Sequence, residues 1–179
     1  AMIAQSPPGM LIFPGTTPER SSAVLFELLQ KENVLQGKKL AVLASQTSEV
    51  SVKSTVLPAI KKTGVKTGTT AYLTINGTDT TAAQSQLDSF IARWKSENVN
   101  ALFVTGEATV TKQFVEKVAK QMPGVTLLTD TGDALAQGQD ETKAGLNPNP
   151  YEGMYIAGGY QAADYAKSAN WTYCKTIYE

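Results

Sequence analysis

The stretch ALFVTGEATVTKQF, residues 101–114, decides the fold class. Its first four residues, Ala101 to Val104, are apolar; small polar residues follow at positions 105–109, and apolar residues then recur at helical spacing. A buried strand that ends in a polar turn before a helix is typical of open α/β proteins, whose functional residues lie in the loops after the strands. The stretch therefore predicts one strand of a mainly parallel sheet and a functional loop at its carboxyl end.

Strands and helices alternate along the chain from about residue 20. Strands are predicted for residues 38–45, 65–75, 101–104, 125–130 and 152–159. Residues 45–51 are predicted to form a polar loop, and Pro58 fits a helix that begins near Ser54, because amides of a first turn lack intrahelical partners. Apolar stripes at helical spacing predict the helices, at Val24, Leu25, Leu28 and Leu29; Val52, Val56 and Ile60; Leu87, Phe90, Ile91 and Trp94; and Val110, Phe114, Val115, Val118 and Met122.

This alternation predicts an α/β fold with a doubly wound, mostly parallel five-stranded sheet and helices on both faces. Strands that are joined by helices form right-handed βαβ units, which gives parallel neighbours. The expected strand order is the flavodoxin-like 2-1-3-4-5. In that order the loops after the first, third and fourth strands converge on one edge of the sheet.

The composition excludes several classes of function. The 179 residues carry a formal net charge of zero, so the chain lacks the basic surface that nucleic-acid binding requires. There is no histidine, which excludes Ser-His-Asp and Cys-His catalysis and histidine metal sites. The two glycine-rich nucleotide-binding motifs are absent: there is no G-x-G-x-x-G after the first predicted strand and no G-x-x-x-x-G-K-[ST] anywhere in the sequence. We therefore expect a protein that is not an enzyme and that needs no cofactor or metal.

Short polar side chains dominate the three loops at the predicted sheet edge, residues 45–49, 105–109 and 130–133. Such residues are common as helix caps and turns, which is the alternative interpretation of each one taken singly. Three such loops at one edge favour a surface that binds a small polar molecule. The predicted ligand-binding residues are Ser45, Gln46, Thr47, Glu107, Ala108, Asp130 and Thr131.

Within this set, Glu107 or Asp130 is expected to hold a cationic group of the ligand, and the hydroxyls and amides to hydrogen-bond its polar groups. A second interpretation makes the same two carboxylates the centre of an α/β enzyme that recruits a metal. Turnover that is abolished by Glu107→Gln would support the enzyme, whereas binding without turnover would exclude it.

Several segments together resemble the second lobe of type I periplasmic-binding-like proteins. They are GKKLAVL (37–43), LPAIKKTGVK (57–66), DTTAAQSQL (79–87), NALFV (100–104) and YEGM (151–154), and their order and spacing match over about residues 20–160. The sequence is most similar to the branched-chain amino-acid class of substrate-binding proteins of ABC transporters, also described as extracellular ligand-binding receptors.

The resemblance implies two lobes that close on a ligand in the cleft between them, and therefore a solute-binding component of an ABC importer. Residues 1–18 would then enter from a missing first lobe, residues 19–160 would form the ligand-binding lobe, and residues 161–179 would lead back. It also implies an extracytoplasmic location, a membrane permease as partner, and a cysteine outside this chain that pairs with Cys174. A free buried thiol is the alternative for Cys174, and a ligand-sensing domain of a receptor or regulator is the alternative function.

The ligand class follows from the resemblance only in part. Amino-acid binders of this family often carry an aromatic residue after the first and third strands of this lobe. The corresponding loops here, SQTSEV (45–50) and TGEAT (105–109), carry none. The expectation is therefore an amino acid or a similar small polar molecule.

Overall fold

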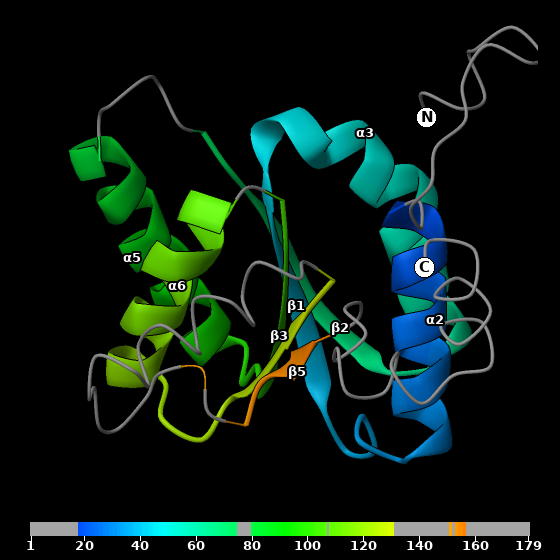
Figure 1. Ribbon diagram of the computed structural model, residues 1–179. Coiled ribbons are helices and arrows are strands. Elements are labelled where there is room, and N and C mark those ends of the chain that lie inside the picture. Colours follow the sequence, from blue (N-terminus) through cyan, green and yellow to red (C-terminus); the bar gives the residue numbers. More distant parts are fainter. Residues whose placement is uncertain (1–17, 75–79, 107, 131–150, 152, 157–179) are drawn as a thin grey trace, which may run out of the picture.

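The computed structural model describes residues 18–74, 80–106, 108–130, 151 and 153–156 (Figure 1). The described strands form one parallel sheet in the order β2-β1-β3-β4-β5, which confirms the predicted fold class and strand order. The strands are β1 (Lys39–Ser45), β2 (Lys66–Leu73), β3 (Ala101–Thr105), β4 (Thr126–Thr129) and β5 (Tyr155–Ile156). The predicted bounds were wider, residues 65–75 for β2 and 152–159 for β5, but residues 75, 152 and 157–159 lie outside the described residues.

Helices cover both faces of the sheet (Figure 1). On one face lie α5 (Thr80–Ser96) and α6 (Ala108–Gln121), whose apolar residues pack with Leu43, Leu73 and Leu102. On the other face lie α2 (Pro18–Lys31) and α4 (Leu57–Lys62), which pack with Leu40, Val42 and Phe103, and α3 (Glu49–Ser51), which has no buried residue. Because β1 and β3 are buried on both faces, they are continuous apolar runs.

The buried face of α2 differs from the predicted stripe. Leu25 and Leu29 are buried as expected, but Val24 and Leu28 are 51% and 52% exposed. The inward face is instead formed by residues 22, 25, 26 and 29, and Phe26 packs edge-on against the ring of Phe103 with 5.1 Å between centroids. The predicted stripe was wrong at two positions because burying the larger Phe26 ring rotates the helix away from them.

The segment after β1 also differs from the prediction. Residues 46–51 are helical, as the 3₁₀ turn η1 (Gln46–Ser48) and α3, and the π-helical turn η2 (Val52–Val56) joins α3 to α4. Pro58 is therefore interior to a helical run, which does not begin near Ser54. In an α-helix its ring would crowd the carbonyl of Ser54. The wider turn, in which the Leu57 amide donates to the Val52 carbonyl, accommodates the proline.

Candidate functional site

The carboxyl ends of β1, β3 and β4 bring polar residues of three segments into one row. Ala44 is paired with Thr105, and Val104 with Thr129, so the residues that follow, Ser45, Gly106 and Asp130, come next along three neighbouring strands. The predicted convergence of these loops on one sheet edge is thus confirmed for the residues that the structure describes.

A cluster of three hydroxyls lies at the end of β1. The Ser45 Oγ is 2.9 Å from Thr47 Oγ1 and 2.8 Å from Ser48 Oγ, and Ser45 itself is buried. The 3₁₀ turn that begins at Gln46 bends the chain back and so brings these side chains together. Gln46 and Thr47 are exposed, and the Gln46 amide donates to Glu49. This end of the sheet therefore offers exposed amide and hydroxyl groups beside a buried serine.

Gly106 places the turn after β3 directly against that cluster. Its backbone φ is +122°, a conformation that residues other than glycine rarely adopt. A Cβ built on Gly106 would lie 3.3 Å from both the backbone nitrogen and the Oγ of Ser45. Glycine is thus required here both by the backbone conformation and by the close approach of two loops.

Asp130 follows β4 and is the charged residue of the row. Its Oδ2 accepts hydrogen bonds from Ser22 Oγ at 3.0 Å and Thr105 Oγ1 at 3.1 Å. Its Oδ1 is buried and has no hydrogen-bond partner among the described residues. Burial raises the pKa of Asp130 above its usual value, while the hydrogen bonds from Thr105 and Ser22 oppose that rise. The Oδ1 atom can accept one further hydrogen bond, or donate one when the carboxyl is protonated.

The structure describes five of the seven predicted ligand-binding residues. Ser45, Gln46, Thr47 and Asp130 lie at the carboxyl edge, and Ala108 begins α6. Glu107 and Thr131 lie outside the described residues, so the structure tests neither.

Asp130 has two partners that the predicted ligand-binding residues did not include: Thr105, which lies in the predicted loop 105–109, and Ser22, which sequence reasoning missed. A signal for Ser22 existed, because it stands three and four residues before the buried Leu25 and Phe26. A polar residue on the buried stripe of a helix needs a hydrogen-bond partner.

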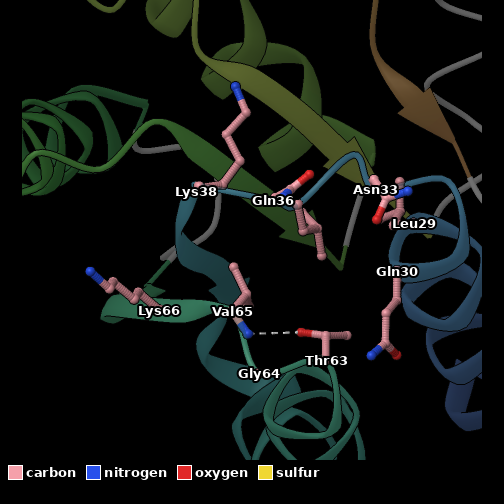
Figure 2. Close-up of a pocket in the computed structure, with 11 residues that line it drawn as sticks. Leu29, Gln30, Asn33, Gln36, Lys38, Thr63, Gly64, Val65 and Lys66 are labelled. Atoms are coloured by element: carbon pink, nitrogen blue, oxygen red, sulfur yellow. Dashed lines mark hydrogen bonds between the residues drawn. The ribbon is translucent and has the colours of Figure 1, made fainter.

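A cavity lies at the opposite edge of the sheet, among the described residues. It has a volume of about 430 Å³ and is bounded by the turns after α2 and α4, with Lys66, the first residue of β2, in its wall (Figure 2). Its polar lining is formed by amides of Gln30, Asn33 and Gln36 and by Thr63, whose Oγ1 accepts from the Val65 amide at 3.3 Å. None of its lining residues is acidic, and Lys38 and Lys66 extend in different directions (Figure 2). This cavity therefore has no buried carboxylate comparable to that of Asp130 at the carboxyl edge.

Two other features of the described residues bear on function. No group of three or more acidic or cysteine side chains gathers there in a way that could hold a metal ion. None of the helices in the described part of the chain is long and apolar enough to cross a membrane.

Comparison with known proteins finds similar structures but no sequence family. No protein-family model matches the sequence, and no curated protein matches it. The chain is similar to a protein described as an ABC transporter permease from the Pseudomonas fluorescens group, with a TM-score of 0.56 and 14% identity, over 88% of this chain and 36% of that one. It is also similar to a solute-binding protein of an R. palustris ABC transporter in complex with 4-hydroxybenzoate, with a TM-score of 0.50 and 16% identity, over 64% of this chain and 30% of that one.

The chain thus spans about a third of the length of the structures that it matches. At this level of identity the likeness shows the fold: an α/β domain with the size and sheet order of one lobe of such proteins.

Proposed function

We propose that this chain forms one lobe of a solute-binding protein and that its ligand binds at the carboxyl edge of the sheet, between Ser45 and Asp130. The observation that carries the proposal is the buried Oδ1 of Asp130, which lacks a partner beside two hydrogen bonds that fix its Oδ2. Leaving a buried polar atom unpaired costs free energy, and a ligand donor that reaches it recovers that cost.

The chemistry of this edge favours a ligand that carries a hydrogen-bond donor or a positive charge. An ammonium or hydroxyl group can donate to Asp130, while the exposed Gln46 and Thr47 can bond a second polar group of the same molecule. An amino acid or a similar small polar solute meets both requirements. A hydroxybenzoate, the ligand class of one structurally similar protein, meets them if its hydroxyl, and not its carboxylate, faces Asp130.

Binding on this account stabilises a closed arrangement of two lobes, since contacts from the second lobe form only when the cleft closes. No chemical step is required, so the ligand is released unchanged. The remaining parts of the proposal, an extracytoplasmic location and delivery to a membrane permease of an ABC transporter, rest on the fold.

A thermal-shift screen tests the proposal, with a panel of amino acids, amides, small peptides, polyamines and hydroxybenzoates. A ligand at a hundred times its Kd adds roughly 2.7 kcal/mol of stability. For a chain of this size that corresponds to a rise in Tm of several degrees, at roughly 2–4 °C per kcal/mol.

The variant Asp130→Asn should abolish the shift, whereas Asp88→Asn, which removes an equal charge from the exposed face of α5, should preserve it. The ligand should be recovered intact after incubation. Equal shifts in both variants, or conversion of the ligand, would contradict the proposed site or the proposed function.

A further inference from the structure

The end strand β2 presents an edge that is prone to pair with another strand. Among the described strands it pairs with β1 alone. Residues 67–78 carry no charge and no proline, and residues 67–73 are rich in threonine with one tyrosine. Uncharged edge strands of high β-propensity are templates for association, and proteins block them with charges, bulges or covering elements.

An irregularity near the start of β2 turns part of its backbone out of the ladder. Leu40 is paired with Thr67 and Val42 with Thr70, so β2 has one more residue than β1 over this interval. The residues between the paired positions are Gly68 and Thr69. A bulge of this kind leaves backbone groups without a ladder partner.

Helix α5 and Glu97, the residue that follows it, supply the partners that the sheet does not. The Thr69 amide donates to Glu97 Oε2 at 2.8 Å, and the buried Trp94 indole donates to the Thr69 carbonyl at 2.8 Å. The Thr69 hydroxyl also donates to Glu97 Oε1. Arg93 lies 3.2 Å from the same oxygen and balances the charge.

The fit around Glu97 is close. A Cβ on Gly68 would lie 2.6 Å from Val99 Cγ2 and 2.9 Å from Glu97 Oε2. Any larger residue at position 68 would therefore displace the carboxylate or the valine. The glycine in this strand is explained by the approach of the side chain that caps it.

A second contact of the same type lies beyond the other end of β2. The Gln86 side-chain oxygen accepts from the Thr74 amide at 3.1 Å, and its nitrogen donates to the Thr74 carbonyl at 3.1 Å. One side chain thus bonds both the backbone amide and the backbone carbonyl of Thr74, as a neighbouring strand would. Glu97 and Trp94 together bond the amide and the carbonyl of Thr69, near the start of the strand.

We propose that these side chains, Gln86 and Trp94 of α5 and Glu97 directly after it, are an edge guard that prevents β2 from pairing with β2 of a second copy of this chain, and that Glu97 is its main residue. The occupant that the guard excludes is a second copy, because the same uncharged strand is present on every molecule. This inference is independent of the proposed ligand site, which lies at the ends of β1, β3 and β4.

The test compares Glu97→Ala, Gln86→Ala and the double variant with Glu116→Ala, which removes an exposed carboxylate from α6. Sedimentation velocity over a range of concentrations measures self-association, and near-ultraviolet circular dichroism of the tryptophans checks folding. We expect the double variant to lower the self-association Kd by about tenfold or more, Glu97→Ala to give most of that effect, and Glu116→Ala to behave as the wild type.

Hydrogen exchange at the Thr69 amide identifies the interface. The amide should exchange slowly in the wild type, quickly in dilute Glu97→Ala, and slowly again when that variant associates. Adding Thr67→Lys to the Glu97→Ala variant should restore the monomer, since an edge lysine opposes strand pairing. If Glu97→Ala does not fold, Glu97→Gln and Gln86→Ala take its place under the same criteria.

Three results would overturn the proposal. One is a folded double variant that stays monomeric at every concentration. Another is association that Thr67→Lys does not reverse or that Glu116→Ala shows equally. The third is a wild-type protein that already pairs through the Thr69 strand.

Discussion

Among the acidic residues that the structure describes, Asp130 has the environment that differs most from that of an ordinary surface acid. Ser22 of α2 and Thr105 of β3 both donate to its Oδ2, so three elements meet at one carboxylate. The resulting bonds join the first turns of α2 to the carboxyl edge of the sheet. They also leave Oδ1 without a hydrogen-bond partner among the described residues, which is why the proposed ligand is expected to donate to it.

The pKa of Asp130 gives the first prediction. Because burial raises this pKa above its usual value, the folded state binds the proton more tightly than the unfolded state does. The stabilising effect of protonation is fully present below both pKa values and is lost as the pH rises from the unfolded value through the folded one. Urea unfolding as a function of pH should therefore show this loss in the wild type and not in Asp130→Asn. Identical pH profiles would contradict the prediction.

Gly106 gives a second prediction for a single residue. Gly106→Ala should lower the free energy of unfolding by about 1–3 kcal/mol, because it combines an unfavourable φ with a tight contact to Ser45. Gly124→Ala is the matched control, since Gly124 also has a positive φ, +83°, but nothing within 4 Å of the added Cβ. Chemical denaturation measures both. An equal loss in the two variants would show that the contact with Ser45 contributes nothing.

Helix α2 is the element on which the structure and the simple apolar pattern disagree. The pattern marked Val24 and Leu28 as buried, but the helix presents residues 22, 25, 26 and 29 to the sheet. The consequence for stability differs sharply between neighbours in the sequence, because Leu28 is 52% exposed and Leu29 only 3%.

Leu29→Ala should cost about 2–5 kcal/mol of unfolding free energy, as for other buried leucines. Leu28→Ala should change it by less than about 0.5 kcal/mol, as for most surface substitutions. The two variants remove the same atoms from adjacent positions, so each is the control for the other. Similar costs from denaturant unfolding would mean that α2 packs on the sheet in the orientation that the sequence pattern predicted.

The sequence predicted well those elements that are marked by a clear apolar pattern, either a continuous run or a stripe at helical spacing. The central strands β1 and β3 are apolar runs, and α5 and α6 have stripes such as Leu87, Ile91 and Trp94 that are buried as expected. The segment 46–58 was predicted less well. Its polar residues were assigned to a loop, and the π turn that accommodates Pro58 depends on contacts of Val52 and Val56 with the core, which no local pattern specifies.

At the scale of the whole molecule, the strand order determines where a site can form. The predicted order placed the ends of β1, β3 and β4 together, and from this the sequence located Ser45 and Asp130 on the same edge. Ser22 could not be placed there from the strand order, because it reaches the edge through the packing of α2. The edge guard on β2 likewise depends on tertiary contacts of α5 with a strand irregularity.

The proposed function depends above all on ligand binding at the carboxyl edge of this sheet. Its most direct test is an amide NMR titration of the isotopically labelled chain with the compound that gives the largest thermal shift. A ligand at that edge should give saturable shift changes at Thr47, Gly106 and Asp130. Little change is expected at Asn33 and Gly64, which line the cavity at the opposite edge of the sheet. Changes centred on Asn33 and Gly64, with none at Gly106, would contradict binding at the carboxyl edge.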